Sequence, residues 1–255
     1  MMSFFDKKPA HLALADGLQL AYHRSSGALP GVVFLGGFTS DMTGIKACAL
    51  ERWCRKRNRA FLRFDYSGHG ASGGKFAEGT IGRWSQEALA VLDRLTEGPQ
   101  ILIGSSMGAW LMLLTALARP DRIAGLLGLA CAVDFTEYLL WERLDETLRE
   151  RLHRERVIRL PSPYGEPYII AWDLIEEAKQ HRLLDQPKLP ITCPVRLIHG
   201  MNDTDVPWRI SLQVAERLSG SDVRLILLKD GEHTLSREQD LVVLTHTLQD
   251  LLEGC

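Results

Sequence analysis

The stretch "QILIGSSMGAWLML", residues 100–113, decides the fold. It places branched apolar residues before a serine flanked by glycines, and a helix-like apolar pattern after it. The run Gly104-Ser105-Ser106-Met107-Gly108 fits G-x-S-x-G, the turn that presents a nucleophilic serine between a strand and a helix. A glycine-rich bend without chemistry is the alternative, and the strand before and helix after favour the nucleophile. We therefore predict Ser106 as the nucleophile and assign Ser105 to the turn.

Composition indicates a globular α/β protein with no affinity for nucleic acid. The 255 residues are 45% hydrophobic and 24% charged, enough for one large domain or two small ones. The net charge is −2, and the charges are interspersed, which argues against nucleic-acid partners and a polybasic membrane patch. Five cysteines, odd in number and without metal-ligand spacing, predict reduced thiols, no disulfide framework and no metal site: Cys48, Cys54, Cys131, Cys193 and Cys255.

The N-terminal stretch "MMSFFDKKPAHLALADG" carries no targeting pattern. It lacks the apolar core and cleavage site of a signal peptide and the Arg-rich, acid-poor character of a transit peptide. The sequence also has no apolar run long enough to span a bilayer. We therefore expect a cytoplasmic protein with no stable membrane anchor.

Strands and helices alternate along most of the chain. Asp16-Gly17 separates two short strand-like runs and predicts an antiparallel hairpin. Strand patterns then alternate with helical periods, which favours a mostly parallel sheet of about eight strands with helices on both faces. The predicted strands begin with "GVVFLGG" and "RAFLRF" and continue at residues 100–104, 123–130, 193–200 and 222–229; the predicted helices are residues 43–57, 79–97, 106–118, 208–219 and 235–252.

A charged and aromatic segment interrupts this alternation. Leucines at helical spacing predict a helical cap over residues 134–188, inserted between core segments 1–133 and 189–255. Its arginines either attract anionic leaving groups or form a solvated face. Six apolar side chains are candidates for lining an acyl pocket, although such stripes more often form a local core: Leu139, Leu140, Trp141, Tyr168, Ile169 and Trp172.

A serine nucleophile needs a histidine base and an acid that orients it, and on this fold they follow in the order serine, acid, histidine. "HGMNDTDVPW", residues 199–208, offers Asp203 and Asp205 directly after a strand. Spacing ahead of Val-Pro favours Asp203, with Asp205 as a helix cap and a simple turn role for Asp203 still open. His233 follows the next strand, whereas His69 precedes the serine and His246 lies inside a helical pattern.

Backbone amides are the expected oxyanion donors. One is the amide of Met107, directly after the nucleophile, and the other lies in the loop "LGGFTSD" after the first parallel strand. Phe38, just past the glycine pair, is the predicted second donor.

These motifs resemble the α/β-hydrolase superfamily over nearly the whole chain: "LGGF", "RFDYSGHGASGG", "GSSMGAW", "HGMNDTDVPW" and "GEH" fall in its order and spacing. The inserted stretch "RLPSPYGEPYIIAWDLIEEAKQHRLL" also resembles a family of mitochondrial serine esterases, described as palmitoyl-protein thioesterases and acyl-glucuronide esterases, and its bacterial relatives. The resemblance implies Ser106, Asp203 and His233 as a catalytic triad. Gly36-Gly37 stands where the superfamily commonly has His-Gly, which preserves the backbone donor and removes a histidine side chain.

The sequence thus predicts a cofactor-independent serine hydrolase that cleaves carboxylic esters or acyl thioesters through an acyl-enzyme. Its partner would be a small-molecule ester or thioester, or an acylated protein. Two alternatives stay open: a carbon–carbon bond hydrolase or lactonase with the same triad, and a non-catalytic binding module of the same fold.

Overall fold

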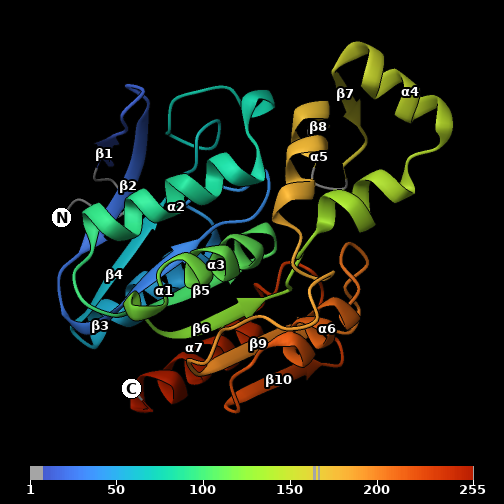
Figure 1. The fold of residues 1–255 in the computed structure, drawn as a ribbon. Coiled ribbons are helices and arrows are strands. Elements are labelled where there is room, and N and C mark those ends of the chain that lie inside the picture. Colours follow the sequence, from blue (N-terminus) through green and yellow to red (C-terminus); the bar gives the residue numbers. More distant parts are fainter. Residues whose placement is uncertain (1–7, 163–164, 166, 255) are drawn as a thin grey trace.

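A central sheet organises the computed structural model, which describes residues 8–162, 165 and 167–254 (Figure 1). In this part of the chain eight strands form one sheet in the order β1-β2-β4-β3-β5-β6-β9-β10. Strands β1 and β2 are antiparallel to their neighbours, and the rest run parallel. The bounds are β1 Ala10–Ala13, β2 Gln19–Ser25, β3 Ala28–Leu35, β4 Arg59–Phe64, β5 Gln100–Ser105, β6 Ile123–Leu129, β9 Val195–Gly200 and β10 Val223–Leu228.

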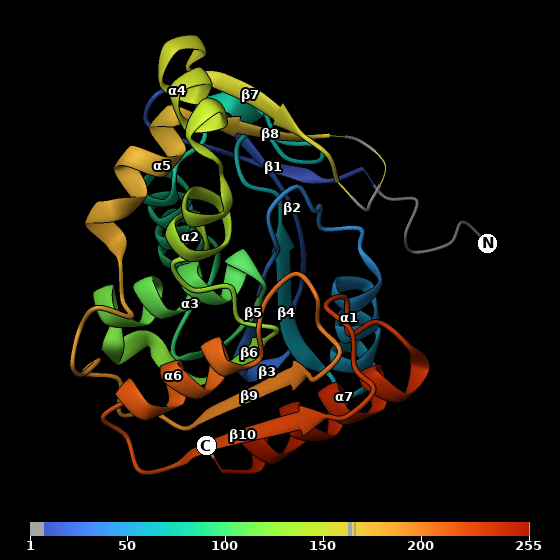
Figure 2. The same ribbon diagram turned by 90° about the vertical axis from the view of Figure 1, so that its right-hand side faces the viewer.

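Helices cover both faces of the sheet (Figure 2), so the side chains of its central strands β3, β5 and β6 are mostly buried. On one side lie α1 (Ile45–Lys56) and α7 (Glu238–Glu253); on the other lie α2 (Ile81–Leu95), α3 (Met107–Ala118) and α6 (Arg209–Arg217). Two separate apolar clusters fill the spaces between helices and sheet. The predicted mostly parallel α/β architecture is confirmed.

The predicted hairpin at Asp16-Gly17 is also present. Gly17 has φ +85°, which favours glycine, and the Asp16 side chain accepts a hydrogen bond from the Leu18 amide at 3.0 Å. The remaining predicted strands and helices are found within a few residues of their expected bounds. Short 3₁₀ turns complete the connections at η2 (Phe76–Glu78) and η3 (Pro120–Arg122).

Residues 134–188, the inserted segment, are not wholly helical as expected. Their helical parts are η4 (Thr136–Leu140), η5 (Trp141–Arg143), α4 (Glu146–Glu155), α5 (Trp172–Ala178) and η6 (Lys179–His181). Strands β7 (Val157–Leu160) and β8 (Tyr168–Ala171) pair antiparallel between α4 and α5. The hairpin forms because Ile158 and Ile170, directly opposite one another, are buried against apolar side chains of the segment's helices.

One buried carboxylate joins the two ends of the inserted segment. Asp134, five residues beyond the end of β6, is fully buried. Its Oδ1 accepts a hydrogen bond from the Leu183 amide at 3.0 Å, and its Oδ2 accepts one from the Leu184 amide at 2.7 Å. The start and end of the segment are therefore held together where they meet the sheet. Among the described residues, no helix combines the length and apolar character needed to cross a bilayer.

Candidate active site

Ser106 occupies a sharp turn between β5 and α3. Its backbone φ is +56°, in the left-handed region that residues with a side chain rarely adopt. A Cβ on Gly104 would lie 2.4 Å from the Gly108 oxygen, and one on Gly108 would lie 2.2 Å from the Leu35 oxygen. Both positions therefore require glycine for strand and helix to approach so closely, and the turn has the geometry that the sequence spacing predicts.

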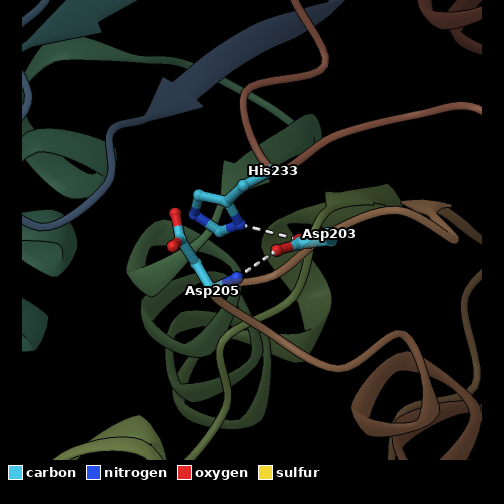
Figure 3. Close-up of side chains that lie close together, drawn as sticks. All are labelled: Asp203, Asp205 and His233. Carbon is cyan, nitrogen blue, oxygen red and sulfur yellow. Dashed lines mark hydrogen bonds and ion pairs between the residues drawn. The ribbon is translucent and has the colours of Figure 1, made fainter. Parts of the chain in front are cut away.

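A continuous chain of hydrogen bonds joins Ser106 to His233 and Asp203. His233 comes from the loop after β10, and its Nε2 lies 3.1 Å from the Ser106 Oγ. The Nδ1 of the same ring lies 2.7 Å from Oδ2 of Asp203, in the loop after β9 (Figure 3). The Asp203 side chain is fully buried, whereas the His233 side chain is 18% exposed. The structure thus brings together the three residues that were predicted to act together.

Asp203 has a hydrogen-bond donor at every side of its carboxylate. Its Oδ1 accepts bonds from the backbone amides of Asp205 and Val206, at 3.0 and 2.8 Å. Its Oδ2 accepts from His233 and from a second imidazole, that of His199, at 3.1 Å. Burial favours the neutral acid, but the bonds from the two histidines outweigh it and hold the pKa of Asp203 well below its usual range. The carboxylate is therefore ionised beside His233.

Sequence reasoning missed His199. It lies in the quoted motif, as the penultimate residue of the buried strand β9. The alternation of side chains along a strand does not indicate which side chain of a later loop will hydrogen-bond to it. Only the bend of the following loop, which returns Asp203 to the end of β9, brings the carboxylate to this ring.

Asp205 lies beside the Asp203–His233 pair without capping α6, which follows Trp208 and has no side-chain cap (Figure 3). One ligand atom each from Asp203, Asp205 and His233 falls within 4.8 Å, a spacing that also suits a metal ion. However, both oxygens of Asp203 are already engaged by hydrogen-bond donors. A cation would have to displace those hydrogens, so the arrangement fits proton transfer better than metal binding.

The two predicted oxyanion donors flank the serine. Phe38 and Met107 both line the cavity above Ser106. Neither backbone amide has a hydrogen-bond acceptor among the described residues. A Cβ on Gly37 would lie 3.4 Å from the Ser106 Cβ, so the loop that carries Phe38 passes directly beside the serine. The Phe38 ring packs at 4.9 Å from Phe76 and 5.4 Å from Phe135, which fixes the loop.

A buried ionic pair also anchors this loop, and sequence reasoning did not identify it. The Met42 amide donates to Asp65 at 2.6 Å, and the Met42 oxygen accepts from Arg63 at 2.7 Å. Arg63 is in turn paired with Glu51 at 2.8 Å, and both are buried. The backbone that leads from Phe38 to α1 is thus held from both sides.

A cavity of about 440 Å³ opens above Ser106. Leu139, Leu140 and Tyr168 of the inserted segment line it, as predicted. Trp141 and Trp172 are not among its lining residues, and Ile169 is likewise absent.

The two tryptophans instead pack against each other, with ring centroids 5.7 Å apart, and face a separate shallow hollow on the inserted segment. Trp141 and Trp172 therefore do not line the cavity that holds Ser106, unlike what the sequence led us to expect, because their rings pack within the inserted segment.

The other histidines considered from the sequence lie elsewhere. His69 is buried among aromatic rings, 5.2 Å from Trp84, and its Nδ1 donates to the Ser67 oxygen at 3.1 Å. His246 is exposed on α7. Neither contacts Ser106, so His233 is the imidazole beside the serine.

The fold and this site define the class: the chain belongs to the α/β-hydrolase family of enzymes. Residues 31–164 match the family described as Serine aminopeptidase, S33. Within that class, the chain belongs with the palmitoyl-protein thioesterase ABHD10. It is 45% identical over 238 residues to the mitochondrial protein of that name from Mus musculus, covering 92% of this chain and 79% of the relative.

A human relative and a solved structure agree with this placement. The mitochondrial ABHD10 of Homo sapiens is 42% identical over 236 residues, which cover 92% of this chain and 76% of that protein. The structure of alpha/beta hydrolase domain-containing protein 10 from mouse has a TM-score of 0.89 and 42% identity, covering 97% of this chain and 99% of that chain. The predictions of a hydrolase and of its family are thereby confirmed.

The predicted cytoplasmic location is wrong. The finding against it is that the relatives that match more than nine tenths of the chain are named mitochondrial. The prediction rested on reduced cysteines and on the N-terminal residues. Reduced thiols fit any reducing compartment, so they do not distinguish one location from another; Cys48, Cys54 and Cys131 are free, and Cys255 lies outside the described residues.

Proposed function

We propose that this protein is a cofactor-independent serine hydrolase that cleaves carboxylic esters or acyl thioesters through an acyl-enzyme. The observation that carries the proposal is the unbroken chain from Ser106 Oγ through His233 to the ionised Asp203. A serine hydroxyl is a weak nucleophile until an oriented base removes its proton. Two amides without acceptors beside that hydroxyl support an oxyanion site.

The first half-reaction forms the acyl-enzyme. As Ser106 Oγ attacks the acyl carbon, its proton passes to His233 Nε2, and the carbonyl oxygen becomes an oxyanion held by the Phe38 and Met107 amides. Asp203 accepts the Nδ1 hydrogen and stabilises the imidazolium. When the tetrahedral intermediate collapses, the proton on Nε2 goes to the departing alkoxide or thiolate, and the acyl group stays on the serine oxygen.

The second half-reaction releases the acid. His233 Nε2 takes a proton from a water molecule, whose oxygen attacks the acyl carbon of the ester on Ser106. Collapse of the second intermediate returns that proton to Ser106 Oγ. The enzyme is regenerated without metal or redox chemistry in any step.

We also propose that the inserted segment, residues 134–188, acts as a cap on a core formed by residues 1–133 and 189–255. Leu139, Leu140 and Tyr168 support this role, since they contribute apolar wall to the cavity that holds Ser106. Lys46 and Asp41 of the core also line the cavity and give it charged groups. An apolar acyl chain fits against the apolar side chains of the cap, and a polar leaving group fits beside Lys46 and Asp41.

The substrate class follows from this division and from the relatives. Proteins named palmitoyl-protein thioesterase share 42–45% of residues with this chain. We therefore propose an acyl ester or thioester as substrate, free as a small molecule or carried on an acylated protein.

Labelling with a fluorophosphonate probe tests the nucleophile. Wild type and Ser105→Ala should label, and Ser106→Ala should not, because the probe phosphonylates an activated serine oxygen. Labelling that persists in Ser106→Ala would contradict the assignment, and an absence of labelling in wild type would favour a non-catalytic binding module.

A substrate panel tests the reaction class. Activity on p-nitrophenyl esters of increasing chain length and on acyl thioesters is expected, and product analysis identifies the bond cleaved. Cleavage of diketones or lactones in preference to these substrates would favour the carbon–carbon hydrolase or lactonase alternative.

A further inference from the structure

A second histidine, His199, contacts the same carboxylate oxygen as His233. His199 is the penultimate residue of β9 and is fully buried. Its Nε2 lies 3.1 Å from Oδ2 of Asp203 and 3.1 Å from the backbone oxygen of Val206. Its Nδ1 lies 2.7 Å from Oγ of Ser211, which is also fully buried.

These partners determine where the His199 proton resides. Nε2 faces two oxygens that only accept hydrogen bonds, because Asp203 is ionised and Val206 contributes a carbonyl. Nε2 therefore carries the hydrogen. In the neutral ring Nδ1 is then an acceptor, and the Ser211 hydroxyl donates to it.

The chain of buried groups continues beyond Ser211. Cys131, fully buried after β6, lies close to the same hydroxyl. The ring thus has a hydrogen-bond partner at each nitrogen, and these partners fit a single tautomer.

We infer that His199 is a positioning residue for Asp203, an inference that rests on the proposed serine hydrolase function. The His199 Nε2–H fixes Oδ2 in the orientation in which it accepts from His233 and keeps the carboxylate ionised. The Ser211 hydroxyl donates to Nδ1 and so holds the ring in the orientation from which Nε2 donates to Asp203. His199 itself touches neither Ser106 nor the cavity, so it acts only through Asp203.

The contribution of His199 is smaller than that of Asp203, because Asp203 Oδ1 keeps two backbone donors when His199 is changed. Loss of one charge-assisted hydrogen bond corresponds to a fall of roughly 10- to 100-fold in kcat. KM should change little, because the ring lies outside the cavity.

Two amide variants separate positioning from packing. His199→Gln can place its amide nitrogen near the position of Nε2 and so donate to Asp203. His199→Asn can reach only the Nδ1 position, beside Ser211. We expect His199→Gln to keep kcat within a few-fold of wild type and His199→Asn to lose roughly 10- to 100-fold. Equal losses in the two variants would overturn the inference; His246→Gln, on the exposed face of α7, is the control.

A double-mutant cycle tests whether the effect passes through Asp203. His199→Asn should cost nothing further in kcat when it is added to Asp203→Ala, because no carboxylate is left to position. The same fold-loss in both backgrounds would mean a general structural role and would overturn the inference.

Ser211→Ala tests the same inference without removing the His199 imidazole. Without the hydroxyl Nδ1 loses its donor and the ring is no longer held on that side, so kcat should fall several-fold at unchanged KM; an unchanged kcat would contradict the claim for Ser211. Failure of the proposed function would be recognised separately, since wild type itself would then not label at Ser106 with fluorophosphonate.

Discussion

Asp203 and Asp134 are buried carboxylates that each follow a parallel strand of the sheet, β9 and β6, yet their environments shift their pKa values in opposite directions. Burial raises the pKa of Asp134 to about 6, because backbone amides of Leu183 and Leu184 compensate only in part. Burial acts on Asp203 in the same direction, but hydrogen bonds from His199 and His233 hold its pKa well below the usual range. Each carboxylate accepts hydrogen bonds from two backbone amides, and Asp203 accepts two more from imidazoles.

This difference in hydrogen-bond donors separates a carboxylate that can take part in proton transfer from one that holds two segments of the fold together. Imidazole donors can become cations, so they stabilise a negative charge through every step of proton transfer. Backbone amides stabilise it less, but they belong to the chain itself and can join segments. Asp203 accordingly orients a base, and Asp134 closes the inserted segment.

The largest expected effect is on kcat, which should respond very differently to changes at Asp203 and at Asp134. Asp203→Asn should lower kcat by about 10⁴-fold, because an amide nitrogen can disfavour the required tautomer of His233. Asp134→Asn should change kcat by no more than a few-fold. Steady-state kinetics on a p-nitrophenyl ester would measure both, and comparable losses in the two variants would mean that the carboxylates do not have distinct roles.

The next effect concerns folding. Asp134→Ala leaves the buried amides of Leu183 and Leu184 without their acceptor. The free energy of unfolding should fall by about 2–4 kcal/mol, measured by urea denaturation. Asp134→Asn retains one acceptor oxygen and should lose less; a stability equal to wild type in the alanine variant would contradict the proposed closure.

The pH dependence of stability should also distinguish Asp134. Its pKa is about 6 in the folded protein against an ordinary value of 3.8, so the folded state holds the extra proton between these values. The stability due to Asp134 is therefore complete below about pH 4 and is lost as pH rises through about 6, a change of about 3 kcal/mol. Denaturation at several pH values should show that the free energy of unfolding of wild type falls relative to that of Asp134→Asn over this pH range. A constant difference would refute the shift.

The smallest expected effect is on KM, and it should distinguish the face of the inserted segment at the cavity from the face at the other hollow. Tyr168→Leu alters the cavity wall and should raise KM several-fold for long acyl substrates. Trp172→Leu changes packing on the other face and should leave kcat/KM within about two-fold. KM values across a chain-length series measure both, and the reverse ranking would show that Trp172 faces substrate.

The order of strands and helices could be read from the sequence because its signals are local. Strand–turn–helix periodicity around Ser106, and loops after strands that carry Asp203 and His233, specify one edge of a parallel sheet. The same reasoning could not find His199, because its partner comes from the bend of a loop and not from strand periodicity.

The inserted segment was the least predictable region. Helical leucine spacing was visible, but the pairing of Ile158 with Ile170 depends on contacts across the hairpin. An apolar stripe also does not indicate which of two hollows it faces. For that reason Tyr168 was placed correctly at the cavity, and Trp141 and Trp172 were not.

Trapping of the acyl-enzyme tests the central claim most directly. Wild type is mixed with a p-nitrophenyl ester, quenched in acid during the first turnover, digested and analysed by mass spectrometry. The acyl group should be found on the peptide that contains Ser106, joined through its oxygen, and the adduct should be absent in Ser106→Ala. Hydrolysis that continues in Ser106→Ala, or an acyl group on another residue, would contradict the account.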